Sequence, residues 1–282
     1  MDNHFLLTRI FVKFLILFAF MLTVTVPVHG QSVCQSVSSR IKPGDILYVD
    51  GMGEERYIDY HDWDSSEPPG TALGVVFYAY YGRTPYEVSN DIETEPEWHG
   101  WIVSVEEDSC IWCPTTSPCY NTCVANYEVG GINTPNNPYH PFNIPHDTSG
   151  WQSTYRILDF IYEGQNKILS NSVMPPLYWI FSMKNGVTDF STMPAMGWDS
   201  WYMPSDAQYS ILYGYLGCVN AAMTACGGIR FRNFQRWLTC TERGGTYPRK
   251  IQVMFYTGKF LDVDNQQTDK KYGGALRAVR NF

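Results

Sequence analysis

The sequence is short of basic residues. Lys and Arg number 20 against 28 Asp and Glu, so the formal net charge of the 282 residues is −8. Nucleic acids and anionic membranes are bound by clustered basic side chains. Apart from local spots such as Arg230, Arg232 and Arg236, no such cluster occurs. We therefore expect neither nucleic acid nor an anionic membrane as the main partner.

Catalytic motifs are absent as well. The sequence has no Gly-x-Ser-x-Gly elbow, no His-Glu-x-x-His and no glycine-rich phosphate loop. The histidines His61, His99, His140 and His146 are scattered, and no pair of carboxylates has a spacing that marks a glycosidase. These absences predict a protein that is not an enzyme and that has no cofactor and no catalytic metal.

Long apolar runs are missing after the first residues, which argues against a transmembrane anchor. The run from Phe14 to Val24 follows Arg9 and Lys13 and precedes Gly30, a layout typical of a signal peptide. We expect residues 1–30 to be cleaved, and loss of their charges would move the net charge to −9.

The segment after the expected cleavage site does not resemble a lipid-anchor site. Cys34 follows Gln31, Ser32 and Val33 rather than the apolar and small residues of a lipobox. The sequence therefore predicts a secreted, periplasmic or outer-surface protein. Residues 31–282 have a length suited to a single domain.

Aromatic residues are plentiful at 16%, which suits a β-rich domain. β-Branched and aromatic runs predict strands at 44–50, 73–81 and 99–105, and a hairpin over 251–263. Helices are expected from Ser149 to Gly164 and from Asp206 to Cys226, where apolar residues repeat at helical spacing. The first apolar stripe includes Trp151 and Tyr155. Strands, two helices and further strands in this order predict an α+β fold.

All eight cysteines follow the predicted signal peptide, where disulfides persist. We expect disulfides to involve Cys34, Cys110, Cys113, Cys119, Cys123, Cys218, Cys226 and Cys240. Their pairing stays open, except that Cys218 and Cys226 lie too far apart on one helix to bond each other. A Cys-rich and Pro/Asn-rich stretch at about 108–147 is expected to be a stapled loop insertion. Zinc at Cys110-x-x-Cys113 and Cys119-x-x-x-Cys123 is the less favoured alternative.

Several motifs together resemble a known family. They are GVVFY at 74–78, His99-Gly100-Trp101, WYMPS at 201–205, Leu212-Tyr213, Val219-Asn220, Gly227-Gly228, Thr241-Glu242 and LRAVRNF at 276–282. In this order they are similar to the Fibrobacter succinogenes-type major paralogous domain of exported Bacteroidetes proteins, a relative of the C-terminal domain of the Legionella collagen-like adhesin. The resemblance implies a C-type-lectin-like fold and binding at a surface. The stretch at 110–146 has no counterpart in that pattern.

The calcium and sugar motifs of C-type lectins, Glu-Pro-Asn and Trp-Asn-Asp, do not occur. Trp198 with Asp199 is the better candidate for a surface site. Trp201, beside a helix cap, and Trp237, in a strand, are instead expected in the core. The group at Asp262 is expected to be a solvated hairpin tip. The candidate ligand-binding residues are Trp198, Asp199, Trp237, Glu242, Asp262, Asp264 and Asn265.

These observations favour an exported, non-catalytic adhesion or ligand-binding protein of a bacterial envelope, with a glycan or extracellular matrix ligand. The alternative is a structural subunit of a fimbria or surface layer, which would self-assemble. A third hypothesis, an enzyme on the same fold, would need a reactive cysteine pair by analogy with the sulfatase-activating oxidases.

Overall fold

The computed structural model describes residues 41–82, 97–122, 124, 150–242, 250–256, 261–262 and 267–282. The expectations for the signal peptide, Cys34, Cys123, residues 125–147, Asp264 and Asn265 fall outside these ranges. Within the described residues, no helix has the length and apolar character needed to cross a membrane.

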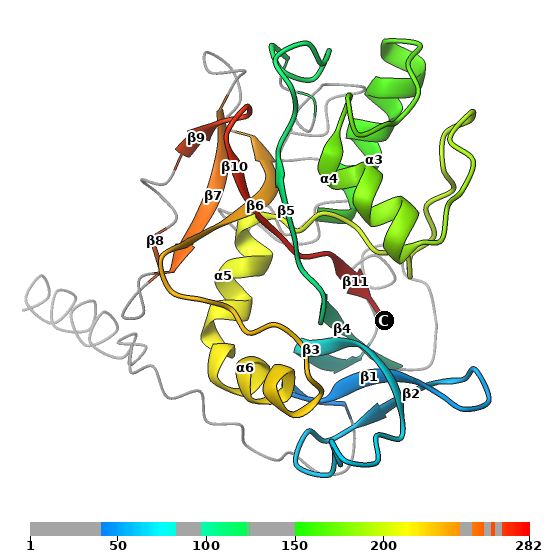
Figure 1. The fold of residues 1–282 in the computed structure, drawn as a ribbon, viewed down its shortest axis with the longest axis vertical. Helices are drawn as coiled ribbons and strands as arrows, with labels where there is room; N and C mark the ends of the chain where they lie inside the picture. Colours follow the sequence, from blue (N-terminus) through cyan, green and yellow to red (C-terminus); the bar gives the residue numbers. More distant parts are fainter. Residues whose placement is uncertain are drawn as a thin grey trace, which may run out of the picture. The chain divides into compact units, whose positions relative to one another are not determined.

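The first of two sheets contains the strands predicted near the start of the chain (Figure 1). Its order is β11-β4-β3-β1-β2, and every pairing is antiparallel. The strands are β1 (Ile46–Asp50), β2 (Glu55–Ile58), β3 (Gly70–Gly82), β4 (Glu97–Ser104) and β11 (Val279–Asn281). The strands predicted at 44–50, 73–81 and 99–105 are thus confirmed.

The second sheet has six strands, in the order β5-β10-β6-β7-β8 with β9 also paired to β7. The strands are β5 (Asp108–Ile111), β6 (Gln235–Glu242), β7 (Lys250–Tyr256), β8 (Leu261–Asp262), β9 (Gln267–Asp269) and β10 (Gly273–Leu276). Strand β10 runs parallel to β6, and the other pairings are antiparallel. Pairing of Phe255 with Asp262 confirms the two arms of the predicted hairpin.

The first predicted helix is α3 (Gly150–Asp159), which continues as a π-helical turn, η1 (Phe160–Gly164). The second is divided at Tyr215 into α5 (Asp206–Gly214) and α6 (Leu216–Ala225). Gly214, a poor helix former, precedes the break. The predicted start of α5 is confirmed, because Ser205 and Gln208 form a complete capping box.

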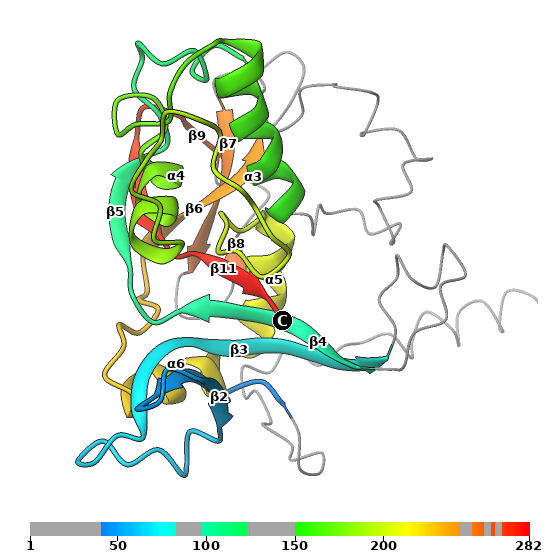
Figure 2. The ribbon, with the colours of Figure 1, turned by 90° about the vertical axis from the view of Figure 1, so that its right-hand side faces the viewer.

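A further helical segment was not expected from the sequence. It consists of α4 (Pro175–Trp179) and the π-helical turn η2 (Ile180–Lys184). Helices α3 and α4 pack against the second sheet, through β6 and β5 respectively (Figure 2). Helix α5 contacts β3 as well as β6 and β7, so it lies where the two sheets meet. The α+β class is confirmed, with more helix than predicted.

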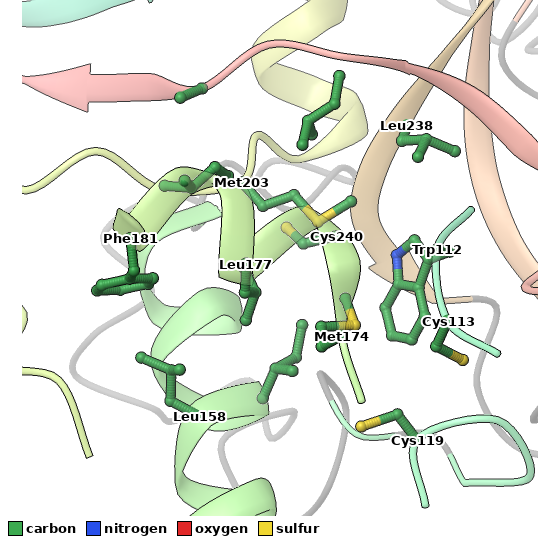
Figure 3. Close-up of a cluster of buried hydrophobic side chains, with 14 of the residues drawn as sticks. Trp112, Cys113, Cys119, Leu158, Met174, Leu177, Phe181, Met203, Leu238 and Cys240 are labelled. Carbon is green, nitrogen blue, oxygen red and sulfur yellow. The ribbon is translucent and has the colours of Figure 1, made fainter. Parts of the chain in front are cut away.

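The start of the expected loop insertion at 108–147 belongs to the core, which corrects the prediction for its described part. Residues 108–111 form β5, and the side chains of Trp112, Cys113 and Cys119 are fully buried. They pack in one cluster with side chains of α3, α4 and β6, including Leu158, Leu177 and Leu238 (Figure 3). The indole N–H of Trp112 donates to the carbonyl of Thr239 on β6 at 3.0 Å.

A buried ion pair fastens this stretch to the second sheet. Lys270 and Glu242 pair with side chains that are both 0% exposed. The Lys270 ammonium also donates to the carbonyls of Cys119 at 2.8 Å and Thr122 at 2.6 Å, and it lies 4.5 Å from the ring centroid of Trp112. A buried charge is tolerated only when it is paired and hydrogen-bonded. These contacts therefore hold residues 112–122 in place.

The end of the chain joins the two sheets, because β10 belongs to one and β11 to the other. Between them lies Arg277, which is fully buried. Its guanidinium donates to the carbonyls of Ser104 at 2.9 Å and Val105 at 3.3 Å, and pairs with Glu107. Burial lowers the pKa of Arg277 to about 10, against the opposing effect of Glu107, so the side chain stays charged at neutral pH.

Candidate ligand-binding surface

Trp198 lies at the surface, as expected from the sequence, with 59% of its area exposed. It occupies the loop between η2 and Trp201. The loop closes on itself, because the Ser200 N–H donates to the Gly197 carbonyl at 3.1 Å and the Gly197 N–H donates to Ser200 Oγ at 2.9 Å. The indole is therefore presented by a short, hydrogen-bonded turn.

Two aromatic side chains of α3 lie beside Trp198. Trp151 and Tyr155, one helical turn apart, stack with centroids 6.0 Å apart and ring planes at 11°. The Trp151 ring lies 6.3 Å from that of Trp198 at 46°. Tyr155 is 43% exposed, and Trp151 is half-buried. We call Tyr155, Trp151 and Trp198 the aromatic ridge.

The helix and the loop are joined directly beneath the aromatic ridge. The indole N–H of Trp151 donates to the Gly197 carbonyl at 2.8 Å. Three residues further along α3, Thr154 Oγ1 accepts from the Met203 N–H at 3.1 Å. Gly150 allows this approach, because a Cβ there would lie 2.8 Å from the Met203 carbonyl oxygen. The position of α3 relative to the loop is thus fixed at two points.

A buried chain of hydrogen bonds supports Trp198 from below. The Gln208 amide donates to the Tyr202 hydroxyl at 2.8 Å, and that hydroxyl donates to Asn281 Oδ1 at 2.7 Å. The Asn281 amide then donates to the Trp198 carbonyl at 3.0 Å. Burial raises the pKa of Tyr202, which keeps its phenol protonated as a donor. We call these residues the supporting network.

Polar groups lie next to the aromatic ridge. Asp199 follows Trp198 and is exposed. Arg280 pairs with both carboxylate oxygens of Glu55, at 2.6 and 2.8 Å. Burial opposes the charged form of Arg280, but the hydrogen bonds and charge of Glu55, with a smaller effect of Asp199, raise the pKa of Arg280. Asp199 therefore places a carboxylate next to the exposed indole, and Arg280 is near enough to feel its charge.

Two candidate residues of strand β6 do not belong to this surface. Trp237 is 2% exposed, with its ring 4.5 Å from Phe231 and 5.5 Å from the Arg277 guanidinium carbon. Glu242 is buried in the pair with Lys270. Both side chains are buried, and residues 237–240 of β6 are four consecutive buried positions, so neither residue is presented at this surface. The core interpretation of Trp237 and Trp201 is confirmed.

For the remaining candidates, no contact with the aromatic ridge is seen among the described residues. Asp262 lies on β8, opposite Phe255 of β7. Asp264 and Asn265 lie outside the described residues. Trp151 and Tyr155 were expected in the apolar stripe of their helix. Their spacing of four residues placed them correctly on one face, but that face is partly in solvent.

The expected disulfide framework is not seen between described cysteines. Cys218 is disulfide-bonded, whereas Cys110, Cys113, Cys119, Cys226 and Cys240 form no disulfide. Burial raises the pKa of Cys110 and of Cys119 to about 12, which disfavours the thiolate. Among the described residues, no three His, Cys, Asp or Glu side chains are grouped to hold a metal ion.

No protein-family model matches the chain, and a search of curated proteins found no match. A solved structure of similar fold is a fimbrial protein from Bacteroides ovatus, with a TM-score of 0.55 and 14% sequence identity. The match covers 88% of this chain and 50% of the fimbrial protein, so the chain spans about half of that protein's length. At this identity the likeness shows the fold alone.

Proposed function

We propose that the protein is an exported, non-catalytic binding protein of a bacterial cell surface that takes an oligosaccharide on the aromatic ridge. One observation carries the proposal: three aromatic rings from two segments lie side by side, and Trp198 and Tyr155 are 59% and 43% exposed. Exposed apolar surface of this kind marks interaction sites. The apolar faces of sugar rings stack on Trp and Tyr side chains, while their hydroxyls need polar partners.

The polar partners are close by. Asp199 offers carboxylate oxygens that accept hydrogen bonds from sugar hydroxyls, and its side chain is exposed beside Trp198. An oligosaccharide, which presents apolar ring faces and a rim of hydroxyls, fits this combination better than a purely apolar ligand. The supporting network adds affinity, because a surface held in its binding conformation loses little entropy when the ligand arrives.

The cellular setting of the proposal is supported by the sequence. Residues 1–30 have the pattern of a signal peptide, and the resemblance to exported Bacteroidetes domains implies a C-type-lectin-like arrangement of the α+β fold. An extracellular matrix protein carrying glycans is a ligand of the same chemistry.

A second role, a subunit of a fimbria or surface layer, is favoured by a different observation. This is the fold likeness to the fimbrial protein from Bacteroides ovatus. The two roles are compatible, since an assembled surface protein can also bind a ligand. They differ in what they predict for the isolated protein, because a subunit self-associates and a binding module need not.

A glycan and matrix-protein array tests the binding role. We expect the purified protein to bind a restricted set of glycans, with affinity unchanged by a chelator because no calcium motif is present. Trp198→Ala should weaken binding about fivefold, since one stacked ring is worth about 1 kcal/mol.

The matched control is Tyr272→Ala, which removes a ring that is 53% exposed but lies outside the aromatic ridge. This variant should bind the array like the wild type. The proposal is wrong if the wild type binds no glycan or matrix protein, or if Trp198→Ala binds as well as the wild type.

A further inference from the structure

A groove lies in the second sheet, lined by residues that are not part of the aromatic ridge. It has a volume of about 1070 Å³ and is lined by parts of β5 and β10, the turn that enters β6, and Phe255 of β7. Gly273 and Gly274 form part of its floor. A Cβ at Gly274 would lie 2.9 Å from Leu238, so the sheet is closely packed beneath the groove.

The charge of this groove is opposite to that of the chain. Among the described residues that line it, the charged ones are Arg232 and Arg236 and none is a carboxylate, whereas the net charge of the sequence is −8. Arg232 pairs with Glu107, but Glu107 also pairs with the buried Arg277, so one carboxylate is shared by two guanidiniums. Arg236 is exposed and has no ion-pair partner among the described residues. The groove is therefore a positive site on an acidic protein.

An exposed aromatic ring stands at the same groove. Phe234 is 71% exposed and has a φ of 60°, a conformation that bulky residues rarely adopt. Its ring meets Phe255 at 6.4 Å and 64°, in an edge-to-face arrangement. Backbone strain of this kind persists where the surrounding structure enforces it, and it concentrates at functional sites. The Phe234 ring is therefore exposed to solvent, and Arg232 and Arg236 flank it in the sequence.

The sequence contains a segment of matching charge. In Asp91-Ile-Glu-Thr-Glu-Pro-Glu97 a carboxylate occurs at every second position. Alternate side chains of an extended segment point the same way, so an extended segment of this pattern presents four carboxylates on one side and Ile92 on the other. Glu97, the last of the four, is exposed at the start of β4.

We propose that the groove binds the carboxylate-rich segment 91–97 of a second copy of the chain. Arg232 and Arg236 pair with its carboxylates, and Phe234 with Phe255 packs against its apolar side. This contact would be the surface through which subunits associate, so the proposal rests on the subunit role proposed above. It is independent of the aromatic ridge and of sugar binding.

The first test uses a fluorescent peptide with the sequence of residues 90–98, titrated with the whole protein. We expect binding that weakens with added NaCl and at least tenfold with Arg236→Glu. A peptide with Asn and Gln in place of its four carboxylates should bind at least tenfold more weakly. Lys167→Glu, an equal charge reversal at an exposed position outside the groove, should bind like the wild type.

The second test is sedimentation velocity of the intact protein. The wild type should associate as its concentration rises, Arg236→Glu should not, and Arg236→Glu combined with Glu95→Lys should restore association. Circular dichroism checks that each variant is folded.

Each other result counts against the proposal. If association is unchanged by Arg236→Glu, the groove is not the contact surface, but the subunit role still stands. If the wild type is monomeric and does not bind the peptide, both the groove contact and the subunit role are wrong. A groove that binds dextran sulfate but not the peptide overturns the choice of a second copy as the partner.

Discussion

The tryptophans of this protein occupy two contrasting environments. Trp112 and Trp237 are buried, each with a buried cation over the ring: Lys270 at 4.5 Å and Arg277 at 5.5 Å. Trp198, by contrast, is 59% exposed and has another indole as its neighbour. The interior rings are part of what holds the two sheets and residues 112–122 together. The exposed ring contributes little to packing and is available to a ligand.

The largest expected effect on stability comes from removing the buried ion pair between Lys270 and Glu242. Lys270→Met should destabilise the protein by about 3–5 kcal/mol, because it removes the buried cation that pairs with the buried Glu242 carboxylate. Chemical denaturation measures the loss. Lys270→Met combined with Glu242→Leu should recover part of it, since the buried carboxylate is removed while the carbonyls of Cys119 and Thr122 still lack the Lys270 donor. A single variant as stable as the wild type would show that this ion pair does not hold residues 112–122.

Tyr202→Phe tests the link between the interior and the aromatic ridge. It removes the hydroxyl that joins Gln208 to Asn281, which should cost about 1–2 kcal/mol because buried polar groups lose a partner. Glycan binding should weaken less than in Trp198→Ala, since the ring itself remains. Thermal denaturation and the glycan array measure the two effects. Unchanged stability would contradict the supporting network.

A partly exposed ion pair should matter less than the buried one. Lys42 pairs with Asp59, and both side chains are about one quarter exposed, at 27% and 25%. Partial burial acts to raise the pKa of Asp59, but hydrogen bonds from Lys42 and His61 outweigh it and lower the pKa to about 2.

Asp59→Asn should therefore cost less than about 1 kcal/mol at neutral pH. Because the folded-state pKa lies below the ordinary value of about 3.9, the contribution is present above that value and is lost as the pH falls through about 2. Denaturation of wild type and variant across this range measures it. A stability difference that grows on acidification would contradict the assignment.

The smallest expected effect on stability is that of Trp198→Ala. An exposed side chain away from the core typically changes stability by less than about 0.5 kcal/mol. The melting temperature should stay close to that of the wild type while glycan binding falls. A large drop in melting temperature would show that Trp198 stabilises the fold, as the buried Trp112 and Trp237 do.

The strands near the start of the chain were predictable, because runs such as 73–81 combine β-branched and aromatic residues. Segment 175–184 was not, since it opens with two prolines and its helix is too short for a clear period. Residues 112–122 look like a loop in sequence, but the side chains of Trp112, Cys113 and Cys119 are buried against residues of α3, α4 and β6.

The candidate site shows the same limit. Helical spacing put Trp151 and Tyr155 on one face of α3, but spacing does not say whether a face meets the core or solvent. Trp237 and Glu242 are buried instead, because their strand contacts both α3 and α5 and its residues 237–240 are four consecutive buried positions. No local sequence pattern reveals that packing. In each case tertiary packing decided the outcome.

The most direct test of the central claim is an NMR titration that follows the indole N–H signals of the tryptophans. The protein would be labelled with ¹⁵N and titrated with the oligosaccharide that it binds best on the array. We predict that the signals of Trp198 and Trp151 shift with ligand concentration while those of Trp112 and Trp237 stay unchanged. Shifts confined to the interior indoles, with Trp198 and Trp151 unmoved, would contradict the aromatic ridge as the binding surface.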